Sequence, residues 1–139
     1  MKKAFAVALL LLVAASTVYG QQKAVKIVFD CTSPDTLTHQ AAMRHITLMA
    51  SSYPDSKFEL VLYGASMPMV LKGKSTVSKS IGQIVQNKNV EIKICQYTLD
   101  RNKVDKSQLL PGVGTVPDGI LEIVTKQGEG WGYIKEAQD

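Results

Sequence analysis

Short apolar runs recur along the chain and alternate with longer stretches of helical periodicity. The runs are rich in valine and isoleucine and are bounded by glycine, proline, asparagine or aspartate, which is typical of β-strands. We expect strands at residues 24–30, 58–63, 90–95 and 131–135, and a turn with a short fourth strand within 111–116. A polar tail is expected from Glu136 to Asp139.

Three stretches between these runs carry apolar residues at the 3.6-residue period of an amphipathic helix. Ser33 and Pro34 have the residue types of an N-cap and of a first helical position, and Pro117-Asp118 starts the third helix. The inward positions that the period predicts are Ala42, Ile46, Met49 and Ala50, then Val77, Ile81, Ile84 and Val85, and finally Ile120, Leu121 and Val124.

Strands that alternate with helices predict an α/β fold with a largely parallel sheet. Right-handed crossovers restrict the topology further. The expected architecture is a flavodoxin-like three-layer sandwich of about five mostly parallel strands in the order 2-1-3-4-5. In that order the first and third strands are neighbours, and ligands bind at the carboxyl ends between them.

The first 20 residues are typical of a secretory signal peptide and not of the fold. A short positive segment precedes an apolar run over 4–15, and Val18 and Gly20 suit cleavage before Gln21. The run is shorter than the ~20 residues of a membrane span, and no second one follows, so stable membrane insertion is not expected. Residues 21–139 contain no repeat or linker, which predicts a single exported, periplasmic domain.

The charge balance gives no reason to expect nucleic-acid binding. Removing Lys2 and Lys3 with the signal segment lowers the formal net charge from +4 to +2. The only arginines are Arg44 and Arg101, so there is no arginine-rich stripe to follow a phosphate backbone.

Both cysteines, Cys31 and Cys95, lie in the exported part, at or just after the ends of the first and third strands. Cys95 precedes a turn or helix start, where a thiolate would be favoured, although a buried inert thiol fits the position equally well. Cys31 has three interpretations: a structural disulfide with Cys95, a resolving thiol, or a core residue. Under the expected strand order the two thiols flank one crevice and are close enough to bond.

His39 lies near the start of the first helix, on its core-facing side, and is a candidate acid, base or thiolate partner of the crevice. A hydrogen-bonded packing histidine is the alternative at that position. With Cys31 and Cys95, His39 has the donor atoms of a soft-metal site, but no ligand spacing supports one. We therefore expect no metal and no cofactor.

Several segments resemble the DsrE/DsrF-like proteins of sulfur relay, and the resemblance covers about residues 25–135. The segments are 63–64 (YG), 71–74 (LKGK), 95–99 (CQYTL), 109–113 (LLPGV), 116–120 (VPDGI) and 126–135 (KQGEGWGYIK). The resemblance implies a flavodoxin-like fold and assembly into homotrimers or homohexamers. It also implies that Cys95 carries a persulfide received from a donor protein and handed to an acceptor protein. The export signal and Cys31 depart from the relay pattern.

These observations lead to one hypothesis and two alternatives. The leading hypothesis is an exported sulfur-relay or sulfurtransferase-like protein that carries sulfur on Cys95 without independent turnover. The first alternative is a non-catalytic oligomeric binding module held by a structural Cys31–Cys95 disulfide. The second is a thiol–disulfide exchanger that uses the same pair.

Overall fold

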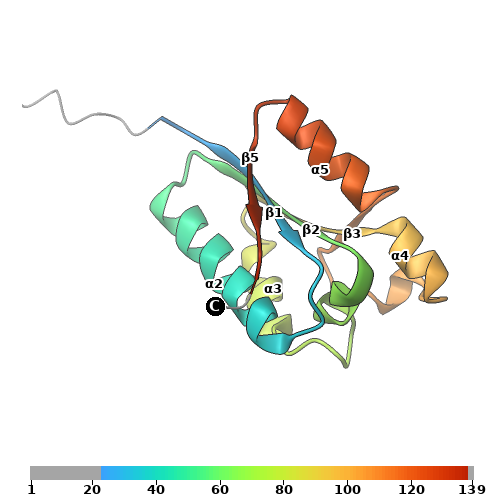
Figure 1. The fold of residues 1–139 in the computed structure, drawn as a ribbon. Helices are drawn as coiled ribbons and strands as arrows, with labels where there is room; N and C mark the ends of the chain where they lie inside the picture. The colour runs from blue at the N-terminus through green and yellow to red at the C-terminus, as the bar shows by residue number, and fades with distance from the viewer. Residues whose placement is uncertain (1–22, 138–139) are drawn as a thin grey trace, which may run out of the picture.

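The computed structural model describes residues 23–137, and the expected signal peptide at residues 1–20 lies outside them. Five strands and six helical segments alternate along this part of the chain (Figure 1). Their order is β1 (Lys26–Cys31), α2 (Thr36–Ser52), β2 (Lys57–Leu62), η1 (Gly64–Val70), α3 (Ser78–Ile84), β3 (Val90–Cys95), α4 (Gln96–Arg101), η2 (Lys106–Gln108), β4 (Gly114–Val116), α5 (Gly119–Gly128) and β5 (Gly132–Lys135).

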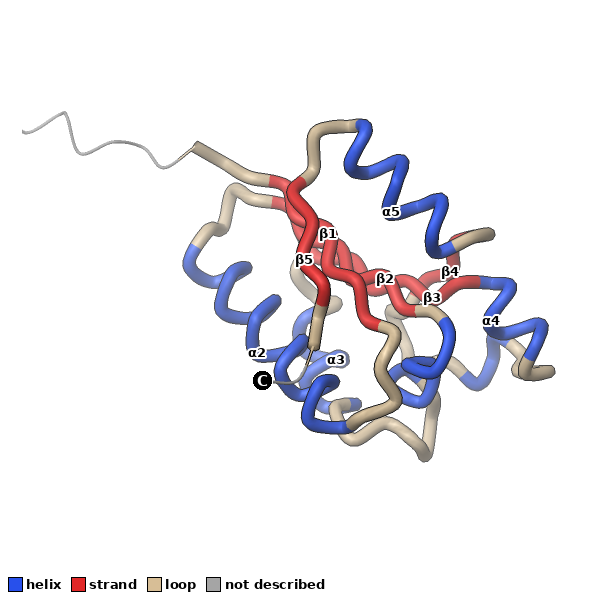
Figure 2. Tube along the Cα trace, in the orientation of Figure 1, coloured by secondary structure: helices blue, strands red, loops and turns tan. Residues whose placement is uncertain are grey.

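The sheet is wholly parallel and lies between helices on both faces (Figure 2). This confirms the α/β class and the three layers. The strand order is β4-β3-β2-β1-β5, which is consistent with a flavodoxin-like fold but differs from the expected 2-1-3-4-5. The difference matters for the site, because β2 lies between β1 and β3.

The handedness of the crossovers explains which helix covers which face. From β1 to β4 each strand is added on the same side of the previous one, so right-handed connections all pack on one face. That face holds the main core, with residues of α2, α3 and α4 against the sheet. The step from β4 to β5 runs back past β1, so α5 packs on the other face. Within the described chain, the connections after β3 and β4 therefore diverge to opposite faces.

Two details of the helices differ from the sequence expectations. The N-cap of α2 is Asp35, whose carboxylate accepts from Thr38 N–H (2.8 Å), and Ser33 Oγ instead accepts from Asp35 N–H (3.1 Å). In α5 the inward residue is Ile123, whereas Ile120, Leu121 and Val124 are each about 60% exposed. The reason is that α5 covers buried charge, so its polar side faces the sheet.

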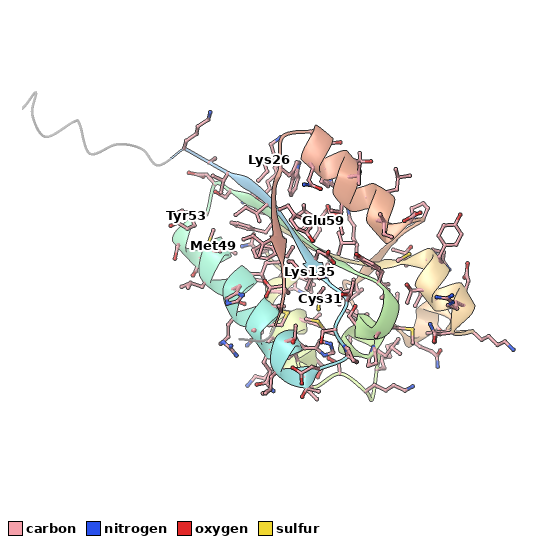
Figure 3. The ribbon with its side chains drawn as sticks, in the orientation of Figure 1. Lys26, Cys31, Met49, Tyr53, Glu59 and Lys135 are labelled. Atoms are coloured by element: carbon pink, nitrogen blue, oxygen red, sulfur yellow. The ribbon has the colours of Figure 1, made fainter. Side chains whose placement is uncertain are left out.

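The buried charge beneath α5 is the carboxylate of Glu59 in the central strand β2 (Figure 3). Glu59 Oε2 accepts from Lys93 Nζ of β3 (3.1 Å) and from Lys126 Nζ of α5 (3.2 Å). Lys126 also stacks on Trp131, 4.6 Å from the ring centroid. These contacts fix α5 on a face that has only a small apolar cluster of its own.

Candidate functional site

Cys95 is the last residue of β3 and the N-cap of α4, which begins at Gln96. Its neighbour Ile94 belongs to the main core, so the alternation of a strand directs Cys95 to the opposite face, towards α5. Gly119 at the start of α5 lies against it: a Cβ added to Gly119 would be 3.2 Å from Cys95 Cβ. The thiol is 5% exposed and is reached through a pocket.

The pocket has a volume of about 810 Å³ and opens at the carboxyl edge of the sheet. It lies where the connections after β3 and β4 diverge, which is the usual ligand position in open α/β sheets. Its lining residues are Tyr63, Gly64, Ala65, Cys95, Tyr97, Thr98, Asp100, Arg101, Asn102, Asp118 and Ile120.

Local contacts hold the pocket walls in place. Gly64, with φ of +64°, follows the end of β2, and its N–H donates to Thr98 Oγ1 of α4 (3.0 Å). Asp118 caps α5 by accepting from Ile120 N–H and Leu121 N–H, at 2.9 and 3.2 Å. The Cys95 thiol donates weakly to Pro117 O at 4.0 Å. The segments that follow β2, β3 and β4 therefore meet at Cys95.

Cys31 lies on the other side of the sheet and outside this pocket. Its register partner is Leu62, and Leu62 in turn pairs with Ile94, so Cys31 shares the main-core face and not that of Cys95. It is fully buried, and burial raises the pKa of its thiol from 9.0 to about 11. These features make it a core residue in its packing.

The expectation that the two thiols flank one crevice is wrong for this fold. With β2 between them, their Cα atoms are roughly 10 Å apart, two strand spacings, beyond the ~7 Å limit for a disulfide. Their side chains also point to opposite faces, and both cysteines are free. A bond between them would require the sheet to open.

His39 is placed in the first turns of α2 and is 2% exposed. Its Nε2–H donates to Ser33 O at 2.8 Å, and it does not line the Cys95 pocket. The structure therefore gives His39 the packing arrangement that was its alternative interpretation. Across residues 23–137 there is no group of three or more His, Cys, Asp or Glu side chains placed to hold a metal ion.

Sequence reasoning missed the residues that meet Cys95 from other strands. Tyr63 directly follows β2, and because Leu62 pairs with Ile94, the register places Tyr63 beside Cys95. A Cβ on Gly119 would also be 3.2 Å from Tyr63 Cδ1, so the three residues meet. The available signal was position: Tyr63 and Gly119 lie at the carboxyl ends of their strands or just beyond. Tyr97, in the 95–99 segment that resembles the family, also lines the pocket.

None of the helices between residues 23 and 137 has the length and apolar character needed to span a bilayer. Comparison with curated proteins gives no match. Three solved structures share the fold. MTH1491 of Methanobacterium thermoautotrophicum, a protein of unknown function, is 24% identical with a TM-score of 0.74, over 80% of this chain and 98% of that one.

The E. coli ychN protein is 15% identical with a TM-score of 0.64, over 82% of this chain and 99% of its own. BT1422 of Bacteroides thetaiotaomicron, of unknown function, is 19% identical with a TM-score of 0.64, over 79% and 93%. At these identities the three structures show the fold alone. The model of the DsrE/DsrF-like family matches residues 25–135, nearly all of the part described here, and the chain belongs to that family.

Proposed function

We propose that this protein is a sulfur carrier that holds sulfane sulfur as a persulfide on Cys95. Membership of the DsrE/DsrF-like family suggests a sulfur-relay-like role in general. The observation that supports Cys95 as the carrier is its position: a nearly buried cysteine that lines a pocket of about 810 Å³ at the carboxyl edge of a parallel sheet.

The chemistry needs no oxidant beyond the donor. The Cys95 thiolate attacks the outer sulfur of a donor persulfide, R–S–SH, forming the new S–S bond while the donor S–S bond breaks and the donor leaves as a thiolate. In the second step an acceptor thiolate attacks the outer sulfur on Cys95. Cys95 then leaves as a thiolate, ready for another donor.

The side chains around the pocket are suited to proteins as donor and acceptor. With Cys95 only 5% exposed, a sulfur atom transferred to it would lie within the pocket. Tyr97 and Ile120 line the pocket and are 66% and 60% exposed, so they offer apolar contact to an approaching protein. A partner would deliver sulfur by projecting a cysteine-bearing loop between them.

The two alternatives that rely on a Cys31–Cys95 bond receive no support from the fold. Both need the thiols to meet, as a permanent staple or as a redox pair, and β2 separates them. The exchanger would also need Cys31 to attack as a thiolate, whereas burial raises the pKa of that thiol to about 11.

Exposure to a persulfide donor followed by intact-mass analysis tests the proposal. The wild-type chain should gain the mass of one sulfur atom, and Cys95→Ser should gain none. Cys31→Ser is the matched control, because it removes the other thiol and should load as the wild type does. Loading of Cys95→Ser, or no loading of the wild type with a donor that loads another carrier, would contradict the proposal.

We propose further that the protein acts after export to the periplasm and as a homotrimer or homohexamer. The signal-like residues 1–20 support export. Two further exposed apolar residues of α5, Leu121 and Val124, support assembly, because such side chains are usually covered. Fractionation with N-terminal sequencing tests the first point. Light scattering tests the second: Leu121→Ser should lower the assembly mass, whereas Leu48→Ser, at a 64% exposed position of α2, should not.

A further inference from the structure

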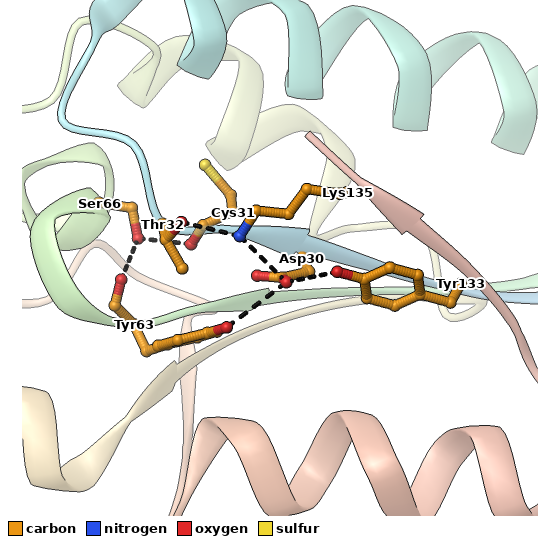
Figure 4. Close-up of polar contacts among 7 residues, drawn as sticks. All are labelled: Asp30, Cys31, Thr32, Tyr63, Ser66, Tyr133 and Lys135. Atoms are coloured by element: carbon orange, nitrogen blue, oxygen red, sulfur yellow. Dashed lines mark hydrogen bonds and ion pairs between the residues drawn. The ribbon is translucent and has the colours of Figure 1, made fainter. Parts of the chain in front are cut away.

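A buried carboxylate, that of Asp30, is bound by residues of β5 and of the segment that follows β2 (Figure 4). Asp30, in β1, is 3% exposed. Its Oδ2 accepts from Tyr133 Oη at 2.8 Å and from Lys135 Nζ at 3.1 Å, both in β5, and from Tyr63 Oη at 3.5 Å. Its Oδ1 is buried and has no partner within the described residues. The main core does not need this cluster, since it lies on the other face.

Tyr63 connects the cluster to Cys95. Its ring and Cβ meet Gly119 next to Cys95, while its hydroxyl reaches Asp30. The electrostatics agree with this position: burial raises the pKa of Tyr63, the Asp30 carboxylate raises it further, and charge on Cys95 adds to the effect. Asp30 and Cys95 thus both contribute to the raised pKa of Tyr63.

The positive member of the cluster lies against the same ring. Lys135 Nζ is 5.7 Å from the centroid of Tyr63, within the range of a cation–π contact, and also donates to Thr32 Oγ1 at 2.8 Å. The side chain of Lys135 is 42% exposed, whereas the side chain of Asp30 is 5% exposed. The pair thus places a deep negative charge and a shallower positive charge behind the Tyr63 wall of the pocket. The charged residues that line the pocket itself are Asp100 and Arg101 of α4 and Asp118 before α5.

We propose that Asp30 and Lys135 are positioning residues of the Cys95 site, and that they balance the charge next to the reacting sulfur across the ring of Tyr63. This inference rests on the proposed role of Cys95 as the reacting thiol. A buried carboxylate alone would disfavour a thiolate or a persulfide anion on the same face, and the ammonium of Lys135 offsets that repulsion.

The test is the pH profile of Cys95 alkylation by iodoacetamide, read on the Cys95 peptide by mass spectrometry. Asp30→Asn removes the negative charge and should move the midpoint of the profile down by about half a pH unit. Lys135→Gln removes the positive charge and should move it up, by less, because Lys135 is more exposed. The double variant should fall between the two.

Asp55→Asn and Lys57→Gln serve as matched controls, because they make the same charge changes at the amino end of β2, the opposite edge of the sheet. They should leave the midpoint within the error of the wild type. Opposite shifts for Asp30→Asn and Lys135→Gln support the inference, since a merely structural role would not give opposite signs.

Shifts in the same direction, or no shift beyond the controls, would overturn the inference. Lys135→Gln alters a half-exposed edge residue and keeps the test open if Asp30→Asn fails to fold. Alkylation requires no persulfide. A negative result here is therefore distinguishable from a failure of Cys95 to take up sulfur.

Discussion

The sheet has one face packed against α2 and α3 and another packed against α5, and the two faces bury different kinds of residue. The first face is continuous and apolar, and it includes Phe29, Leu60 and Ile92 from neighbouring strands. The second has a small apolar cluster between two polar groups, Glu59 with its lysines and Asp30 with its tyrosines. A single sheet thus buries mainly apolar side chains on one side and polar groups together with a small apolar cluster on the other.

The two cysteines show the same contrast in one residue type. Cys31 and Cys95 both end a strand at the carboxyl edge of the sheet. Cys31 is fully buried in the apolar face, whereas Cys95 lines a pocket on the polar face. The position at a strand end therefore does not fix the environment of a thiol, and the face to which the side chain points decides it.

The largest expected effect comes from the apolar face. Ile46 of α2 is fully buried, so Ile46→Ala should lower the free energy of unfolding by about 2–5 kcal/mol through lost burial and a cavity. Urea denaturation followed by circular dichroism measures it. Leu48→Ala, at a 64% exposed position on the same helix, is the control and should change it by about 0.5 kcal/mol or less. Equal losses would mean that the two sites are not packed as described.

Alkaline pH should lower the free energy of unfolding through ionisation of the Cys31 thiol. Burial raises the pKa of this thiol from 9.0 to about 11, so the folded state keeps a proton that the unfolded state releases. The resulting stability is complete below pH 9 and is lost as pH rises from 9 towards 11, by about 3 kcal/mol. Measuring how the free energy of unfolding falls with pH in wild type and in Cys31→Ala isolates the contribution of this thiol. An equally steep fall in Cys31→Ala would contradict the burial of this thiol.

The charged group beneath α5 should matter less than the core but more than surface charge. Glu59 is fully buried between Lys93 and Lys126, so Glu59→Gln should lower the free energy of unfolding by about 1–3 kcal/mol. The matched control is Glu91→Gln, which removes a 58% exposed partner of the same Lys93 and should cost about 1 kcal/mol or less. Chemical denaturation of both variants measures the two losses in free energy of unfolding. Equal losses would contradict the claim that burial sets the difference between them.

The smallest effect on the free energy of unfolding is expected at Gly119, where the main effect is on the pocket around Cys95. Gly119→Ala places a methyl group 3.2 Å from Cys95 Cβ and Tyr63 Cδ1, so the pocket wall must shift and sulfur loading of Cys95 should slow several-fold. Gly128→Ala, in the last turn of α5 with nothing within 4 Å, should leave loading unchanged and stabilise the helix by about 0.5–1 kcal/mol. Loading rates that are the same in both variants would remove Gly119 from the site.

The elements themselves were predictable because the apolar pattern is local. The strands at 24–30, 58–63 and 90–95 match β1, β2 and β3 within a residue or two, and α2 and α3 follow the expected period. The strand order was not predictable in this way, because nothing in the pattern of a strand names its neighbour. The position of Cys95 at a strand end needed only local information and is confirmed, whereas its expected proximity to Cys31 needed the order and is wrong.

Two further errors have a physical cause in tertiary contacts. In α5 apolar residues occur on both sides, and only the buried charge of Glu59 shows why Glu122 and Lys126 face the sheet. Glu136, expected to begin a polar tail, is 3% exposed and pairs with His45 of α2 at 3.0 Å. Both arrangements depend on partners far away in the sequence, so no local signal points to them.

The two thiols, on opposite faces of the sheet, should react differently with sulfane sulfur, and peptide-level mass spectrometry after exposure to a persulfide donor tests this most directly. The folded wild-type chain should carry added sulfur on the peptide that contains Cys95 and none on the peptide that contains Cys31. An acceptor thiol should then remove it. Added sulfur on Cys31 in the folded protein, or on neither peptide, would contradict the account.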